Sequence, residues 1–236
     1  LLARMDERAP EHGRGLNEAP GSNEVVMMHA TIPMEAFRAL LDKLRTKPLA
    51  FVPPVHLTVR IRQVDKADLP VVHPFQCDYL DRESADDWLR RVEANPGLYL
   101  AAFDGENIAG VCYGHPSRRS EGTAVLQGIA VNLDTAGPYA RRGIGSRLLR
   151  AFERSCAARG FRRIGVGSAD DPKVEAFYRK NGYVPVEIVA KDAECRELER
   201  VKIPAEEAER ADERREALRR KTGAAEVNII FGKELA

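Results

Sequence analysis

The sequence predicts an α/β fold: a mixed, mostly antiparallel sheet with a central parallel β-α-β unit and flanking helices. Residues 124–181 alternate strand, helix, strand and helix, which is typical of a parallel unit with a right-handed crossover. Residues 98–103 and 108–114 are strand-like runs joined by the turn Asp104-Gly105-Glu106-Asn107, which predicts a hairpin. Antiparallel pairing is therefore expected on one side of the parallel unit.

The main domain is predicted to begin near Val55. Residues 56–62 alternate apolar and polar side chains, as expected of a first strand with one buried face. Residues 65–76 and 83–94 have helical spacing, and Ser84 is a good N-cap for the second of these helices. These two helices should precede the hairpin.

The end of the chain is expected to complete the sheet. Residues 184–189 and 227–231 are predicted to be the last two strands. Between them, residues 194–221 are mostly Glu, Arg, Lys, Asp and Ala. So few apolar side chains give a helix little to bury, which predicts a solvated helical insertion, with a partner-docking arm as the alternative.

The segment before Val55 has a different character. Residues 1–24 are polar, charged and rich in Gly and Pro, which predicts a loose tail. A strand over 25–32 and a helix opening at Pro33 follow. We interpret residues 1–54 as a tail and an amphipathic extension that packs on the main domain, 55–236, or on a second subunit of a homodimer, because so short a segment cannot form its own core.

Composition excludes several classes of function. Lys and Arg total 37 against 36 acidic residues, and the net charge of +1 argues against nucleic acid or membrane as a general partner. The four cysteines are widely spaced and form no Cys-x-x-Cys pair, which argues against a metal site and a redox dithiol and favours buried thiols in a reducing cytoplasm. No apolar run approaches the roughly 20 residues of a membrane span, so we expect a cytoplasmic protein.

A glycine-containing loop between a strand and a helix indicates an anion-binding site. Gly143 and Gly145 let the backbone turn without a Cβ, so that consecutive amides can converge on one point. The helix that begins there adds unpaired N–H groups and the positive end of its dipole. The predicted phosphate-binding residues are Arg141, Arg142, Gly143, Ile144, Gly145 and Ser146.

Two common phosphate-binding motifs do not fit this loop. A Walker loop requires Gly, four residues and then Gly-Lys-Ser/Thr, and the chain contains no such run. A dinucleotide fingerprint requires Gly or Ala three residues after its second glycine, where this chain has Leu148. Both nucleotide interpretations are therefore weakened.

A second motif follows on the next β-α unit. Residues 163–183 predict a short strand, a turn and a helix. Asp171 is a suitable N-cap, Pro172 suits the first helical position, and Asn181-Gly182 suits the end. Tyr178 lies in the second half of this helix.

Together the two motifs resemble the GNAT superfamily of acyl-CoA-dependent N-acetyltransferases. Ile129, Ala130 and Val131 match the strand end of motif A, and the two glycines match its loop, although Ala140 replaces the usual Gln or Arg. The family's motif B ends in Tyr and Lys-x-Gly-Phe/Tyr, which Tyr178, Lys180, Gly182 and Tyr183 match. Asp170 or Asp171 stands where the family usually has Asn.

The resemblance implies a GNAT fold and acetyl-CoA as acyl-donor cosubstrate. By analogy, the main chain of Ile129, Ala130 and Val131 would bind the pantetheine arm and acyl carbonyl, and the loop amides, with Asp171 nearby, would complete the cofactor site. Tyr178 matches the family's general acid, which protonates the leaving thiolate after direct attack by an amine in a ternary complex. The acceptor would be an amine-bearing small molecule or protein.

The general base and the acceptor contacts stay open. Some family members carry a glutamate on strand five, where this chain has Val166 or Gly165; Glu121, His115 and Gln127 through a water are the candidates for base. Carboxylates that could attract a cationic amine occur between the first two strands: Asp78, Asp81, Asp86 and Asp87. The alternative function is a catalytically silent acyl-CoA-binding sensor or interaction module, which Ala140 and the missing strand-five carboxylate favour.

Overall fold

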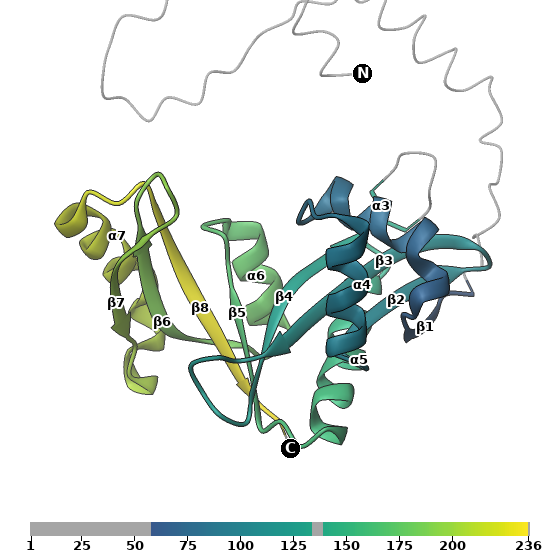
Figure 1. Ribbon diagram of the computed structural model, residues 1–236. Coiled ribbons are helices and arrows are strands. Elements are labelled where there is room, and N and C mark those ends of the chain that lie inside the picture. Colours follow the sequence, from purple (N-terminus) through teal and green to yellow (C-terminus); the bar gives the residue numbers. More distant parts are fainter. Residues whose placement is uncertain (1–57, 134–138, 236) are drawn as a thin grey trace, which may run out of the picture. The chain divides into compact units, whose positions relative to one another are not determined.

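The computed structural model describes residues 58–133 and 139–235, and within these ranges eight strands form one sheet (Figure 1). The strands are β1 (Arg60–Gln63), β2 (Tyr99–Asp104), β3 (Asn107–Pro116), β4 (Thr123–Val131), β5 (Arg163–Gly167), β6 (Val184–Lys191), β7 (Glu197–Lys202) and β8 (Glu226–Glu234). Their spatial order is β1-β2-β3-β4-β5-β8-β6-β7. The predicted tail and extension over residues 1–54 lie outside the described residues and stay predictions.

Only the β4–β5 pair is parallel among the described strands, and every other neighbouring pair is antiparallel. The helix between β4 and β5 makes them the predicted central β-α-β unit. The last strand, β8, lies between β5 and β6. The predicted α/β fold class, with a mixed and mostly antiparallel sheet, is therefore confirmed.

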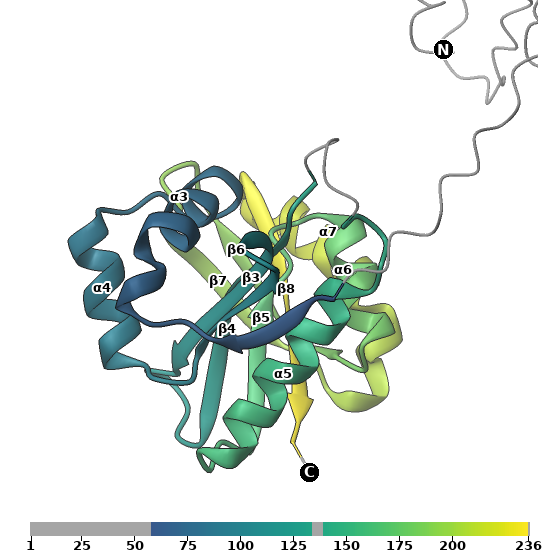
Figure 2. The ribbon, with the colours of Figure 1, turned by 90° about the vertical axis from the view of Figure 1, so that its right-hand side faces the viewer.

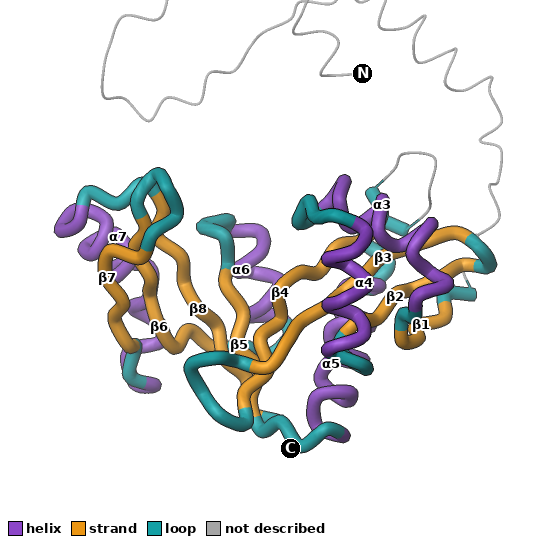
Figure 3. The backbone as a smooth tube through the Cα atoms, viewed as in Figure 1, coloured by secondary structure: helices purple, strands orange, loops and turns teal. Residues whose placement is uncertain are grey.

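Helices cover both faces of the sheet. They are α3 (Leu69–Tyr79), α4 (Ala85–Ala94), α5 (Ile144–Ala158), α6 (Pro172–Lys180) and α7 (Ala211–Thr222), with short 3₁₀ turns η2 (Lys66–Asp68) and η3 (Ala205–Arg210). One face of β2 and β3 packs against α3 and α4, while α5, α6 and α7 lie behind the sheet on the other face (Figures 1 and 2). Figure 3 shows the same arrangement, with the helices in purple and the strands in orange.

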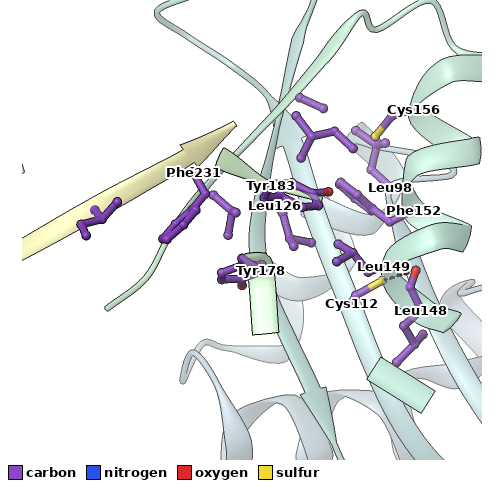
Figure 4. Close-up of a cluster of buried hydrophobic side chains, with 14 of the residues drawn as sticks. Leu98, Cys112, Leu126, Leu148, Leu149, Phe152, Cys156, Tyr178, Tyr183 and Phe231 are labelled. Atoms are coloured by element: carbon purple, nitrogen blue, oxygen red, sulfur yellow. Dashed lines mark hydrogen bonds between the residues drawn. The ribbon is translucent and has the colours of Figure 1, made fainter. Parts of the chain in front are cut away.

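Each face has its own hydrophobic core. Behind the sheet, α5 packs with Leu98, Leu126, Tyr178 and Phe231 through its fully buried residues Leu148, Leu149, Phe152 and Cys156 (Figure 4). On the other face, Trp88 of α4 is fully buried and its Nε1 donates to Gln76 Oε1 of α3 at 3.0 Å. The Ser84 cap predicted for α4 is confirmed, because its hydroxyl accepts the N–H of Asp87 at 3.1 Å.

The prediction of a solvated helical insertion over 194–221 is wrong in two respects. Residues 197–202 form the edge strand β7, which pairs with β6, and only the second half is helical. The insertion is also packed, because three of its apolar residues, Ile203, Ala211 and Leu218, are buried in the core behind the sheet. The composition led to a prediction of a solvated insertion because these three residues are separated in sequence. They lie on one surface only once β7 and α7 have formed.

Replacing Leu218 with Ala should test this packing. Leu218 is 5% exposed, and truncating a buried leucine typically lowers the free energy of unfolding by about 2–5 kcal/mol through lost burial and a residual cavity. Leu198→Ala is the matched control within the same insertion, since Leu198 is 48% exposed and should change stability by less than about 0.5 kcal/mol. Urea unfolding measures both, and equal effects would mean that the insertion is not packed.

Candidate functional site

The two central strands separate part-way along their length. β4 pairs with β3 from Ala124 to Val131, but it pairs with β5 only at Thr123, Ala124 and Val125. The remaining edge of β4 therefore has no strand partner on the β5 side among the described residues. Its backbone N–H and C=O groups are available to an extended ligand, which is how a peptide-like chain binds to a strand edge.

A β-bulge marks the point where the strands part. Tyr113 of β3 is opposite Gly128 while Gly114 is opposite Leu126, so Gln127 is the extra residue of β4. The bulge aims Gln127 at the α3/α4 face, where its side-chain amide donates to Asp81. Gly128 faces the same side, because a Cβ there would lie 2.8 Å from the Tyr113 ring. Bulges of this kind end pairing and redirect side chains next to ligand sites.

The start of α5 presents a group of unpaired amides. Gly143 is the N-cap with a left-handed φ of 73°, and Arg141 is also left-handed at 56°. Where left-handed and right-handed backbone conformations alternate, successive N–H groups point toward one side and form a nest for an anion. The first intrahelical bond runs from Arg147 N–H to Gly143 O at 3.0 Å, so the amides of Gly143 to Ser146 have no partner within the helix.

The next helix, α6, lies beside this nest. A Cβ on Gly145 would lie 3.4 Å from the ring of Phe177 and 3.6 Å from Val131 Cγ2, so this glycine sits where α5, α6 and the end of β4 meet. Asp171 caps α6 as predicted, and its side chain accepts the N–H of Lys173 at 2.8 Å. The two predicted motifs are therefore adjacent in space.

Tyr178 of α6 is 4% exposed and packs against the rings of Phe177, Tyr183 and Phe231, with centroids 5.4, 5.8 and 5.9 Å away (Figure 4). No described residue makes a hydrogen bond to its hydroxyl, yet this hydroxyl is not among the buried polar atoms that are cut off from solvent. Burial, and secondarily the nearby Cys112 thiol, raises the pKa of Tyr178 above the ordinary value of 10.0. The hydroxyl is thus a protonated donor on a side chain that packs among aromatic rings.

A polar network, which the sequence did not predict, lies on the opposite face of β4. Asp81 Oδ2, in the loop between α3 and α4, accepts from Tyr113 Oη at 2.7 Å and from Gln127 Nε2 at 3.3 Å. Within the described residues, no hydrogen bond or ion pair reaches Asp81 Oδ1. Burial raises the pKa of the adjacent Tyr99 to about 12, and burial followed by the Asp81 bond raises that of Tyr113.

The turn between β5 and α6 is strained and is held by the insertion. Ala169 and Asp170 both have a φ of 52°, which is unfavourable for residues with a Cβ. Asp170 Oδ2 accepts from Arg219 Nη2 at 2.8 Å, and Arg215 Nη1 lies 3.5 Å from Asp170 Oδ1 and 2.5 Å from the buried Glu175 of α6. Because α7 supplies both arginines, it fixes the turn from which α6 begins.

The structure thus brings most of the predicted site residues together. Ile129, Ala130 and Val131 lie on the part of β4 that has left β5, and Arg141, Arg142, Gly143, Ile144, Gly145 and Ser146 form the loop and first turn of α5.

Val166 is buried in the core, so the strand-five position is apolar. Of the three candidates for base, Gln127 lies at the bulge, His115 lies opposite Val125, and Glu121 is exposed in the β3–β4 turn. Asp81 is next to the bulge, whereas Asp78 and Asp86 are exposed and Asp87 pairs with Arg90.

Comparison with known proteins agrees with this geometry. The profile described as the acetyltransferase (GNAT) family matches residues 59–183, more than half of the chain. Solved structures with the same fold include Ard1 from Thermoplasma volcanium (16% identity, TM-score 0.52, covering 75% of this chain and 98% of that one) and the ribosomal-protein-S18-alanine N-acetyltransferase from Escherichia coli (17%, 0.50, 75% and 94%). yncA from Salmonella typhimurium, with its cofactor acetyl-CoA, is similar at 15% identity and a TM-score of 0.53, covering 75% and 94%. No curated protein matches the sequence.

Asp170→Ala should test whether the insertion fixes the β5–α6 turn. The change removes the acceptor of Arg219 and a neighbour of Arg215, and losing hydrogen bonds to charged groups should lower the free energy of unfolding by about 2–3 kcal/mol. Amide hydrogen exchange in the first turn of α6 should also become faster. Asp212→Ala is the matched control, because Asp212 is 58% exposed and its pairs with Arg215 and Arg179 should contribute at most about 1 kcal/mol. Unchanged exchange in α6 would show that α7 does not hold the turn.

Proposed function

Because the chain belongs to the GNAT acetyltransferase family, we propose that it transfers the acetyl group of acetyl-CoA to a primary amine by direct attack in a ternary complex. The observation that carries this proposal is the separation of β4 from β5 between the α5 amides and Tyr178. A backbone edge, an anion nest and a protonated hydroxyl are then the three parts of the proposed site. A cytoplasmic location and a homodimer remain predictions.

The described residues fit acetyl-CoA. The unpaired amides of Gly143 to Ser146 suit a pyrophosphate, since four N–H donors and a helix dipole favour an anion. The free edge of Ile129 to Val131 suits the amide groups of a pantetheine arm, because both partners have alternating donors and acceptors. Nothing lies within 4 Å of a Cβ placed on Gly143, so the nest is open to a ligand. When bound, the cofactor supplies an acetyl thioester.

We place the acceptor on the α3/α4 side of the bulge. Asp81 is half-buried and has one carboxylate oxygen without a partner among the described residues. Tyr113 and Gln127 hold its other oxygen and so fix the carboxylate. This arrangement can hold a cationic amine before it loses a proton.

Tyr178 is the proposed general acid. As the amine nitrogen bonds to the acyl carbon and the C–S bond breaks, the sulfur gains a negative charge and needs a proton. The Tyr178 hydroxyl is partnerless among the described residues, in contact with solvent, and kept protonated by its raised pKa. It can therefore donate this proton over the whole physiological pH range.

The alternative is a silent acyl-CoA sensor. The buried Val166 and the alanine at position 140 favour it, because both positions lack polar side chains that the resemblance leads one to expect. A sensor would keep the backbone cradle and bind acetyl-CoA without turnover. Thiol release with a panel of amines distinguishes the two functions.

Tyr178→Phe should lower kcat by about 10²-fold or more while the KM for acetyl-CoA changes little, because loss of a general acid affects the chemical step rather than binding. Tyr183→Phe is the matched control: its ring packs 5.8 Å from that of Tyr178, but its hydroxyl is cut off from solvent. Steady-state thiol release measures both variants. Equal activity of Tyr178→Phe and the native enzyme would reject the proposed role.

The pH profile gives a second readout of the same role. Because the pKa of Tyr178 is raised, the proton-donating form persists above pH 10, and kcat/KM should show no fall on the alkaline side up to about pH 9.5. It should rise with pH as the acceptor amine loses its proton. A decline between pH 8 and 9 in the native enzyme would contradict a tyrosine acid in this pocket.

Gly143→Ala should weaken CoA binding at least tenfold. An alanine at a φ of 73° is strained, so the loop should relax and turn its amides out of the nest. Gly160→Ala is the matched control at the other end of α5, because Gly160 has a φ of 83° and equally open surroundings. Both variants should lose about 1–2 kcal/mol of stability, but only Gly143→Ala should raise the Kd for CoA in calorimetry. If both variants bind CoA equally, the nest is not the pyrophosphate site.

A further inference from the structure

A groove of about 610 Å³ lies between the edge strand β1 and the outer flank of α5. Its lining is unusual because five of its seven residues are arginines. They are Arg60 and Arg62 of β1 and Arg147, Arg150 and Arg154 of α5, with Val59 and Ile61 as the apolar remainder. We call this the arginine groove.

Most of its positive charge is uncompensated. Arg62 is neutralised by Asp68, whose two oxygens accept its guanidinium at 2.7 and 2.6 Å, and this pairing lowers the pKa of Asp68. Arg60, Arg150 and Arg154 are exposed and have no ion pair with any residue that the structure describes. Three like charges around one groove repel each other, and an anionic ligand would relieve that repulsion.

The arginine groove is separate from the proposed acetyl-transfer site. The first turn of α5 faces α6 through Gly145 and Phe177, whereas Arg150 and Arg154 lie farther along the helix and line the groove beside β1. In the sheet, β2 and β3 stand between β1 and β4. Figure 2 shows β1 passing beside α5.

The groove also contains a strand edge that has no partner strand among the described residues. Val64 N–H bonds to Tyr99 O at 2.9 Å, so by the alternation of an antiparallel ladder Arg62 and Arg60 bond to β2, while Ile61 directs its N–H and C=O outward. Val59 follows the same alternation, and its outward carbonyl accepts from Arg147 Nη2 at 2.7 Å. An outward N–H at Ile61 is therefore available beside the arginines.

We propose that the arginine groove binds an extended acidic peptide of a partner protein. A strand laid along β1 would bond to the free edge, and its alternate side chains, about 7 Å apart, would face α5. Arg147, Arg150 and Arg154 span about 10 Å of helix, which matches two or three carboxylates on such a strand. No aromatic side chain lines the groove, which favours a peptide over single-stranded nucleic acid.

The test uses the full-length chain and a fluorescein-labelled octapeptide of alternating Glu and Val, followed by fluorescence anisotropy. Binding should weaken at least tenfold in R150E/R154E, and it should weaken steeply with salt. R118E/R220E is the matched control, because both arginines are exposed and have no ion pair among the described residues. Acetyl-transfer activity should be unchanged in both variants.

A second variant tests the strand edge. Ile61→Pro removes the outward N–H, at a position where an edge strand tolerates proline, and it also shortens a side chain that packs on the core. It should weaken binding of the peptide while leaving the affinity for inorganic tripolyphosphate unchanged. Circular dichroism checks that this variant is folded. Glu-Val peptide binding that is lost in R150E/R154E and kept in R118E/R220E supports the proposal.

Three results would overturn it. The first is equal peptide binding by R150E/R154E and its control. The second is failure of the peptide to bind the native chain, as expected if the chain's own N-terminal segment occupies the groove. The third is displacement of the peptide by tripolyphosphate or by an eight-residue oligodeoxythymidine at lower concentration, which would assign the groove to a phosphate ligand.

Discussion

The fold depends on one interrupted interaction, the hydrogen bonding between β4 and β5. Three residue pairs join these parallel strands and then the ladder stops, although β4 continues for six more residues along β3. A complete ladder would leave β4 without a free backbone edge on the β5 side. Among the described residues, the interruption leaves backbone N–H and C=O groups of β4 without a strand partner, and such groups are stable only where solvent or a ligand can satisfy them. In the proposed function the gap is therefore a binding feature rather than a defect of pairing.

Several independent contacts keep this gap in place. The bulge at Gln127 redirects β4 toward the α3/α4 face, and Asp81 holds the bulged side chain. On the other side, the strained turn at Ala169 and Asp170 is held by two arginines of α7, far along the chain. Gly145 then allows α5 to approach Phe177 of α6 closely. Each contact joins elements that are distant in sequence, so the opening is set by tertiary structure and not by any one loop.

The difference between local structure and tertiary contacts explains what the sequence could and could not predict. The two β-α units and the Asp171 cap follow from local rules of capping and periodicity, and they were predicted correctly. The insertion was not, because Ile203, Ala211 and Leu218 form one surface only after β7 has paired with β6. The Asp81 network was not predicted for a similar reason, because Asp81, Tyr113 and Gln127 lie on three separate elements. Only the extra residue of the bulge turns Gln127 toward the carboxylate. A one-residue change of register is not visible in a period-two pattern.

The backbone character of the cradle also separates binding from chemistry. Main-chain amides and a strand edge bind phosphate and amide groups whatever the side chains are, so Ala140 weakens the resemblance without weakening the nest. Proton transfer has no such tolerance, since it needs a titratable atom at one place. In the proposed mechanism the proton donor Tyr178 comes from α6, and Asp81, which would hold the acceptor amine, comes from the α3–α4 loop, so both lie outside the cradle. Loss of either side chain would leave a protein that binds an acyl thioester without transferring its acyl group. In this fold an enzyme can therefore become a sensor through changes of side chains alone, while the sheet stays the same.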